Sequence, residues 1–247
     1  MPLESGEKVA FCARQAEFTR GIRYHVYRLI GLANLKSVLD VGSGAGVIAE
    51  EIGARSSSLV VGLDREPSRG QAHLSVGGDA LLLPFKGSSF DGAVCHFVLM
   101  WLSDPVSAVK EMKRVVKPGG WIAALAEPDY GGWIDYPDEI RIGAMLADAL
   151  RAEGADPALG RKLRSIFEQA GLKPRIDLSP NMWDVEKLAS EFESEWDWRF
   201  RLLGRSPELE EMKRREEKAI IERKRVLFMP IFWAAARNRG QTFNIQY

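Results

Sequence analysis

The sequence predicts an α/β fold with a doubly wound, mostly parallel sheet and crossover helices on both of its faces. The prediction rests on the order of the elements: four short apolar runs lie at residues 37–41, 59–63, 90–95 and 121–126, and helical stretches separate them. Strands that alternate with helices in this way are typical of parallel sheets. The length of 247 residues, at roughly 150 residues per domain, suggests one large domain with a modest elaboration.

Turn and cap residues mark the ends of several elements. The last of the four strands follows Pro118-Gly119-Gly120, a strong break in regular structure. The clearest helix is predicted over residues 105–117, with Asp104 as N-cap and Pro105 at its first position. Its apolar residues recur at the spacing of one buried helix face: Val106, Val109, Met112 and Val116.

Helical segments flank and interrupt this core, so we expect a single domain over residues 1–247 with two additions. The first is an amphipathic N-terminal segment, residues 1–31, and the second is a polar insertion, residues 182–226. Between them the pattern predicts two helices over 138–171, broken near 154–157, and strands at 174–178 and 229–236.

The charge balance restricts the partners. Lys and Arg together number 34, and Asp and Glu also number 34, so no global basic field attracts a nucleic acid or an anionic membrane. Two cysteines and three histidines predict neither a metal site nor a disulfide framework. With no run of about 18 apolar residues and no export signal, we expect a cytoplasmic protein without membrane insertion.

Within the insertion an acidic segment is followed by a basic one, although the net charge of the chain is zero. Up to Trp198 it carries six acids against one base, and residues 199–225 carry ten bases against six acids. The alternation of Glu with Lys and Arg in the second part favours a solvated, salt-paired helix. A cap over an apolar acceptor, a homodimer surface and an RNA-binding stretch remain as alternatives.

A glycine-rich loop, Asp40-Val41-Gly42-Ser43-Gly44-Ala45-Gly46, follows the first strand and precedes a helical stretch at 47–54. Such a loop brings a ligand close to the main chain and to the unpaired N–H groups of a helix start, which suits a nucleotide-like ligand. Position 47, where the dinucleotide fingerprint needs glycine, is Val47, so nicotinamide cofactors are disfavoured. No Gly-Lys-Ser or Gly-Lys-Thr follows, which excludes a Walker-type phosphate loop.

Two acids, Asp64 and Asp79, lie beyond the glycine loop at positions where they could bind a nucleoside. Asp64 ends the second strand, where a carboxylate accepts both hydroxyls of a ribose. Gly78-Asp79-Ala80 follows 15 residues later; there an Asp accepts from an adenine amine and the next backbone N–H donates to a ring nitrogen. Ligands of open α/β sheets bind at the carboxyl ends of strands, so the three elements together predict one nucleoside site.

These motifs resemble those of the class I S-adenosylmethionine-dependent methyltransferases, most closely the small-molecule branch with the ubiquinone and menaquinone biosynthesis enzymes. The resemblance covers roughly residues 30 to 127. It implies a Rossmann-like, seven-stranded sheet, S-adenosyl-L-methionine as cofactor and transferase activity. It assigns Gly42, Ser43 and Gly44 to the methionine part, Asp64 and Arg65 to the ribose, Asp79 and Ala80 to the adenine, and His96 to a position beside the cofactor. Asp40 and Gly78 are further cofactor-binding candidates in the same motifs.

The catalytic group is not identified by sequence. Methyl transfer from a sulfonium is an in-line displacement that gains much of its rate from alignment and from exclusion of water. Weak candidates for a base are Asp129, His96 and Tyr130. The loop at 127–137 suits an acceptor pocket because it mixes acids with aromatics; the alternative is a packed turn.

The N-terminal segment, residues 1–31, and the insertion, residues 182–226, are expected to act near the bound ligands. In similar enzymes an N-terminal helix caps the cofactor as a lid, and Arg20 or Arg23 is placed to pair with the cofactor carboxylate; the alternative is a helix that packs on the sheet. Trp101 faces either the acceptor or the core. The insertion is expected to cap the substrate. We expect a small-molecule methyltransferase, with an RNA or protein methyltransferase and a non-catalytic, cofactor-binding partner subunit as the alternatives.

Overall fold

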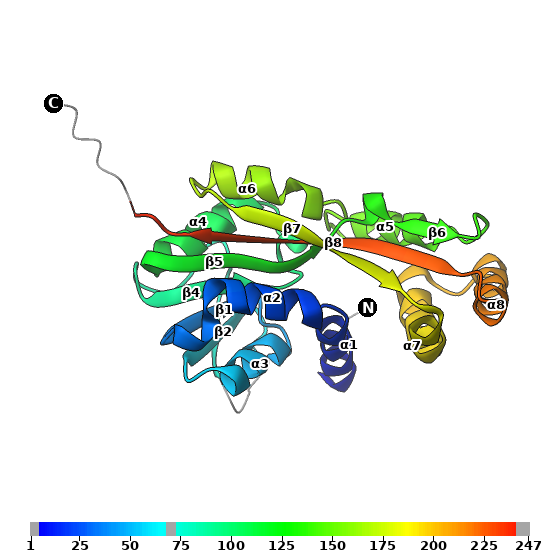
Figure 1. The fold of residues 1–247 in the computed structure, drawn as a ribbon, viewed down its shortest axis with the longest axis horizontal. Coiled ribbons are helices and arrows are strands. Elements are labelled where there is room, and N and C mark those ends of the chain that lie inside the picture. The colour runs from blue at the N-terminus through cyan, green and yellow to red at the C-terminus, as the bar shows by residue number, and fades with distance from the viewer. Residues whose placement is uncertain (1–4, 68–72, 241–247) are drawn as a thin grey trace. The chain divides into compact units, whose positions relative to one another are not determined.

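The computed structural model describes residues 5–67 and 73–240 (Figure 1). They divide into two compact units. Of the described residues, the larger unit comprises 5–67, 73–127, 161–177 and 232–240. The smaller unit comprises Pro128–Gly160 and Leu178–Ile231. The single domain expected over residues 1–247 therefore stays a prediction.

The larger unit contains most of the sheet. Its strands lie in the order β3-β2-β1-β4-β5, followed by the part of β8 that begins at Phe232, and neighbouring strands among the first five are parallel. In register, Val41 at the end of β1 pairs with Leu63 of β2 and Cys95 of β4, so the carboxyl ends of these strands meet at one edge. The bounds are β1 Ser37–Val41, β2 Leu59–Asp64, β3 Leu74–Gly77, β4 Phe90–Cys95, β5 Val116–Pro128 and β8 Val226–Arg237.

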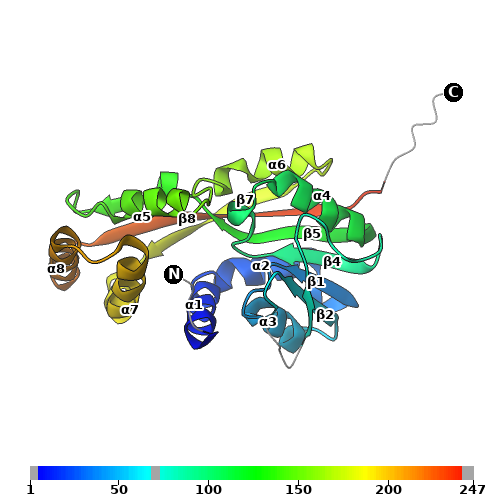
Figure 2. The same cartoon turned by 180° about the vertical axis from the view of Figure 1, so that it is seen from behind.

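Helices cover both faces of this sheet, which confirms the doubly wound arrangement. Figure 2 shows α4 and α6 on one face, with α2 and α3 on the other. The helices of the larger unit are α1 Ser5–Phe18, α2 Arg20–Ile30, α3 Val47–Arg55, α4 Pro105–Val115 and α6 Leu163–Gln169. Short 3-10 helices among the described residues are η1 Leu32–Asn34, η2 Leu99–Trp101, η3 Tyr130–Gly132 and η4 Gly160–Lys162.

Local signals explain where α4 begins and ends. The Asp104 side chain accepts a hydrogen bond from the Ser107 N–H and Pro105 occupies the first helical position, as the sequence predicts. The helix ends at Val115, two residues earlier than predicted, because Val116 already has extended backbone. The segment Pro118-Gly119-Gly120 lies inside β5, so the strand begins earlier than the sequence indicates.

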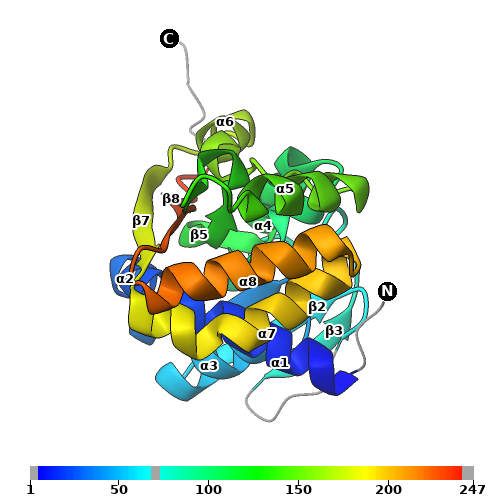
Figure 3. The same cartoon turned by 90° about the vertical axis from the view of Figure 1, so that its right-hand side faces the viewer.

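The smaller unit contains the helical insertion. It includes α5 Ile142–Ala152, α7 Val185–Leu203, α8 Pro207–Ile221 and the short strand β6 Ile134–Tyr136. Helices α7 and α8 lie side by side (Figure 3). Acids of α7 pair with bases on or just after α8: Lys213 with Glu193 at 2.7 Å and Arg223 with Glu186 at 2.7 Å. These pairs agree with the salt-paired interpretation of the insertion.

An aromatic core holds the smaller unit together. Trp196 is fully buried, Phe200 and Phe192 are at most 9% exposed, and the rings of Trp196 and Phe200 lie 5.3 Å apart. Burial of aromatic side chains contributes several kcal/mol to a core of this kind. The abundance of aromatic residues in the insertion is thus explained by packing within it.

The sheet has one strand more than the seven implied by the resemblance. Eight strands are assigned within the described residues: β6 pairs antiparallel with β8 at Ile134–Phe228, and β7 Arg175–Trp183 also pairs with β8. The α/β class and the mostly parallel sheet are confirmed. Among the described residues, none of the helices combines the length and the apolar character that crossing a bilayer requires.

Candidate functional site

The glycine loop after β1 adopts backbone conformations that favour glycine. Gly42, Gly44 and Gly46 have φ values of +72°, +51° and +81°, in the left-handed region that other residues rarely adopt. A Cβ at Gly42 would lie 2.4 Å from the Cγ2 atom of Val98. The loop is held by two hydrogen bonds, in which the N–H groups of Gly42 and Ser43 donate to the Leu63 carbonyl at 2.7 and 2.9 Å.

Asp64, at the end of β2, ties this loop to the next strand. Its Oδ2 accepts a hydrogen bond from the Gly44 N–H at 2.8 Å, and its Oδ1 accepts from the Glu66 N–H at 3.0 Å. A carboxylate has about four acceptor positions. Two therefore remain for the hydroxyl groups of a ligand.

Asp40 places a buried acid under the same loop. The residue is 1% exposed and its Oδ2 has no hydrogen-bond partner in the part of the chain that the structure describes. Burial raises the pKa of Asp40 to about 8, and the nearby Asp64 carboxylate raises it further in the same direction. An orphaned buried oxygen at this position leaves a hydrogen bond that a ligand could complete.

The pKa of Asp40 predicts how stability depends on pH. Because the pKa is about 8 in the folded protein against an ordinary 3.8, the folded state at pH 7 holds a proton that the unfolded chain has lost. The stabilisation that this extra proton gives the folded state is lost as the pH rises through 8. The free energy of unfolding should therefore fall by about 1 kcal/mol between pH 7 and 9. Glu127, with a pKa of about 7, adds a smaller loss in the same direction.

Urea unfolding of the whole chain at pH 7, 8 and 9 measures this slope. The Asp40→Asn variant should flatten it, whereas Asp91→Asn should leave it unchanged, because the Lys117 hydrogen bond holds the pKa of Asp91 below its usual range. An unchanged slope in Asp40→Asn would show that Asp40 does not titrate there.

The loop after β3 brings Asp79 to the residues that follow β2. Arg65 Nη2 donates to Asp79 Oδ2 at 3.1 Å, and the Leu81 N–H donates to Oδ1 at 2.9 Å. The pKa of Asp79 is lowered, first by the Leu81 N–H and also by Arg65. The preceding Gly78 donates its N–H to the Asp64 carbonyl at 3.0 Å. The structure thus brings the two predicted acids, Asp64 and Asp79, to adjacent loops.

His96 directly follows β4 at the same edge. It is half-buried, and its Nε2 lies 2.7 Å from the Thr19 hydroxyl. Burial, and then the charge of Arg23, lower the pKa of His96 well below 6.5. All the residues predicted to contact the cofactor therefore lie in the larger unit, at the carboxyl ends of β1 and β2 or on the loops that follow β1, β2, β3 and β4.

Arg23 has a different role from the one considered for it. Its side chain is 1% exposed, and its Nε and Nη2 donate to the Glu51 carboxylate at 3.0 and 2.7 Å. Its Nη1 donates to the Ala16 carbonyl and to the Thr19 hydroxyl. The exposed Arg20 pairs with Glu17. This favours the alternative in which the N-terminal helix is packed structure, since the Arg23 guanidinium is already engaged.

Glu127 is a site residue that sequence reasoning missed. It is fully buried at the end of β5, and its carboxylate accepts hydrogen bonds from the N–H groups of Val98, Leu99 and Met100 at 3.0, 2.9 and 3.4 Å. Burial raises its pKa to about 7, against the effect of these hydrogen bonds. The sequence signal that could have identified it is an acid at the end of an apolar strand, directly before Pro128.

The loop that follows β5 belongs to the smaller unit and is well packed. Asp129 is 3% exposed and its Oδ1 accepts from the Gly131 N–H at 3.0 Å, which caps η3. Tyr130 stacks on Trp133 with ring centroids 5.5 Å apart, and burial, followed by Glu195, raises its pKa. These contacts fit the packed-turn alternative, and a catalytic role for either residue stays a prediction. Trp101, in the larger unit, is 49% exposed and so is not a core residue.

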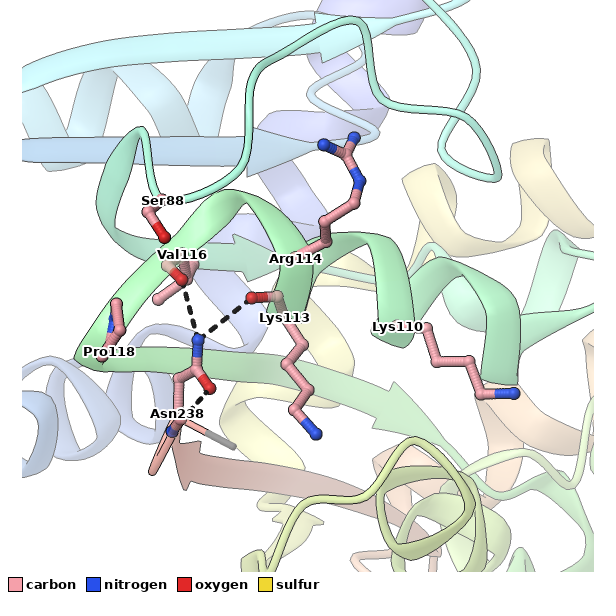
Figure 4. A pocket seen from close by; sticks show the side chains of 8 residues that line it. Ser88, Lys110, Lys113, Arg114, Val116, Pro118 and Asn238 are labelled. Atoms are coloured by element: carbon pink, nitrogen blue, oxygen red, sulfur yellow. Dashed lines mark hydrogen bonds between the residues drawn. The ribbon is translucent and has the colours of Figure 1, made fainter. Parts of the chain in front are cut away.

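A separate hollow of about 410 Å³ lies on the larger unit near the end of α4 (Figure 4). Asn238 lines it and donates to the carbonyls of Lys113 and Val116 at 3.1 and 2.8 Å, while Lys113 Nζ donates to the Gly171 carbonyl at 2.9 Å. None of the predicted cofactor residues lines this hollow. The glycine loop and its partner acids form the better candidate.

Known proteins resemble the part of the chain that contains these loops. Residues 39–124 match a family model described as a methyltransferase domain. The chain is 34% identical over 155 residues to a demethylmenaquinone methyltransferase of Roseiflexus castenholzii, covering 56% of this chain and 63% of that protein. It is 31% identical over 165 residues to a demethylmenaquinone methyltransferase of Renibacterium salmoninarum, covering 62% of this chain and 70% of that protein. The chain thus spans about two thirds of the length of these curated relatives.

The fold also has a solved counterpart. A crystal structure described as a putative methyltransferase from Bacillus halodurans superposes with a TM-score of 0.58 and 19% sequence identity. The match covers 86% of this chain and 98% of that one. At this identity the likeness concerns the fold.

Proposed function

Because the chain belongs to the S-adenosylmethionine-dependent methyltransferases, we propose that it transfers a methyl group from this cofactor to a small organic acceptor. The observation that carries the proposal is the convergence of the glycine loop, Asp64 and Asp79 at the carboxyl ends of neighbouring strands. S-adenosylmethionine supplies a sulfonium-bound methyl group that leaves behind a neutral sulfide when it is transferred.

The residues of the larger unit suit each part of this cofactor. The free acceptor positions of Asp64 suit ribose hydroxyls, and Asp79 suits an adenine amine. The orphaned Asp40 oxygen lies beneath the loop where the methionine part is expected. The left-handed glycines of the loop remove the side chains that would otherwise stand between the ligand and the backbone. The fit therefore depends on geometry as well as on motif.

Alignment and exclusion of water are the contributions that these residues make to the reaction. Glu127 fixes the segment 98–100 after β4 by accepting three of its N–H groups, which holds one wall of the site. Asp64 and the Leu63 carbonyl hold the other wall, the glycine loop. Rigid walls keep a bound reactant in line, which is worth several kcal/mol in a displacement reaction.

A small acceptor is supported by the relatives and by the charges. Two curated relatives are named for demethylmenaquinone, an aromatic acceptor. The net charge is zero, and bases in and after α8 are paired with acids of α7, which weakens the case for an RNA-binding stretch. We propose an apolar, aromatic acceptor of the quinol type.

The test is a methyl-transfer assay with the purified full chain. The protein is incubated with S-adenosylmethionine and one of three acceptors: a reduced demethylmenaquinone, a bulk RNA or a protein extract. The S-adenosylhomocysteine formed is then quantified by mass spectrometry. Turnover with the quinol alone is the expected result. Turnover with RNA or protein would replace the acceptor assignment, and cofactor binding without turnover on any substrate would favour the non-catalytic partner subunit.

A further inference from the structure

The Thr19 hydroxyl, fully buried between α1 and α2, has three close polar neighbours. Its Oγ1 lies 2.7 Å from the Gln15 carbonyl oxygen, 2.6 Å from Arg23 Nη1 and 2.7 Å from His96 Nε2. A hydroxyl has one proton and two lone pairs. Three contacts of this length can all be attractive in only one arrangement of protons.

That arrangement follows from the nature of the partners. The Gln15 carbonyl only accepts, so the Thr19 proton points to it. The guanidinium of Arg23 only donates, so it uses one lone pair of Oγ1. The remaining lone pair faces His96 Nε2, and a contact of 2.7 Å between them requires a hydrogen on the ring nitrogen. Neutral His96 is therefore the Nε2–H tautomer, and its Nδ1 has the free lone pair.

Arg23 holds this arrangement in place. Its guanidinium is fixed by two hydrogen bonds to the Glu51 carboxylate on α3. Its positive charge also opposes a second positive charge on the His96 ring, and the pKa of His96 is lowered accordingly. Among residues 5–67 and 73–240, Nδ1 has no recorded hydrogen-bond partner. The ring is thus a neutral acceptor at neutral pH.

We propose that Thr19 is a positioning residue that fixes His96 in the Nε2–H form, so that Nδ1 accepts a hydrogen bond from the ammonium group of the cofactor; the ligand in this inference rests on the proposed function. His96 directly follows β4, and Val98, two residues later, contacts Gly42 of the glycine loop. The methionine end of the cofactor carries a donor-only ammonium, which a neutral acceptor attracts and an imidazolium repels. The same arrangement argues against His96 as a general base, because Arg23 disfavours the protonated ring.

Nitrogen-15 NMR of the histidine side chains in the full chain tests the first part. The His96 signals should show a protonated Nε2 and an unprotonated Nδ1. In Thr19→Val, which keeps the shape and removes the hydroxyl, the two tautomers should mix. Thr19→Ser restores the hydroxyl and should restore the single tautomer.

Calorimetric binding of two probes tests the second part. S-adenosylhomocysteine, which retains the ammonium, should bind Thr19→Val about fivefold more weakly than the parent, the loss expected when only about a fifth of the His96 rings keep the Nε2–H form. It should bind Thr19→Ser within about twofold of the parent. Methylthioadenosine, which lacks the amino acid part, should bind all three proteins alike. A protonated Nδ1 in the parent chain would overturn the proposal. Equal weakening of both probes in Thr19→Val would also overturn it, since that result indicates only a disturbed fold.

Discussion

Replacing Glu216 with Ala should destabilise the smaller unit by about 3–5 kcal/mol. Glu216 is 1% exposed. Its Oε1 accepts from Arg225 Nε at 2.7 Å, and its Oε2 accepts from Trp196 Nε1 at 2.8 Å and from Arg199. Without the carboxylate, two buried guanidinium groups lose their shared counter-ion, which is far more costly than the loss of a surface pair.

The pKa of Glu216 agrees with this role. Burial alone would raise it, but Arg199 and Arg225 outweigh burial and hold the pKa of the carboxyl below its usual range. A depressed pKa means that the stabilisation is present at neutral pH and is lost as the pH falls through the folded-state value. The network continues through Arg225 to Asp135, so it joins α7, α8 and β6 within the unit.

Urea unfolding of the full chain, followed by tryptophan fluorescence, measures the effect. Glu217→Ala, one residue along α8 and exposed, is the matched control and should change stability by less than about 0.5 kcal/mol. Glu216→Gln keeps the shape without the charge and should fall between the two. Equal stability of Glu216→Ala and Glu217→Ala would show that the buried pairs contribute nothing net.

Replacing Asp64 with Ala should weaken cofactor binding at least tenfold, or more than about 1.4 kcal/mol. The substitution removes the acceptor positions assigned to the ribose. It also frees the N–H groups of Gly44 and Glu66, which donate to this carboxylate, so the glycine loop loses a support. The two losses act in the same direction.

Calorimetry with S-adenosylhomocysteine measures this loss. Glu66→Ala is the control, because its side chain is 86% exposed and pairs only loosely with Lys8 at 3.4 Å; its affinity should stay within about twofold of the parent. Asp64→Asn keeps the size and part of the acceptor capacity. Unchanged affinity of Asp64→Ala would contradict the assignment of the nucleoside site to the end of β2.

The features that could be predicted from sequence are those set by short-range rules. The glycine loop needs left-handed backbone at Gly42, and a helix that starts at Pro105 needs a cap at Asp104; both requirements act over a few residues. The parallel sheet with helices on both faces follows from the alternation of strands and helices, since few topologies satisfy it. For the same reason the predicted acid Asp64 lies beside the glycine loop.

The features that could not be predicted depend on partners far apart in the chain. Arg23 meets Glu51, 28 residues later, and this pairing decides that its guanidinium is buried structure. Glu127 accepts three backbone N–H groups only because the segment at 98–100 folds onto its carboxylate. Strand β6 has three residues, too few for a periodic signal, and it forms because β8 offers a pairing edge.

The contrast between the acidic residues 182–198 and the basic residues 199–225 has a consequence for solution behaviour. The pairs Lys213–Glu193 and Arg223–Glu186 involve exposed atoms, so dissolved ions screen them. The glycine loop is held by backbone hydrogen bonds to the Leu63 carbonyl, on which ionic strength has little influence. Salt concentration is therefore a variable that acts on the hairpin of α7 and α8 and spares the loop after β1.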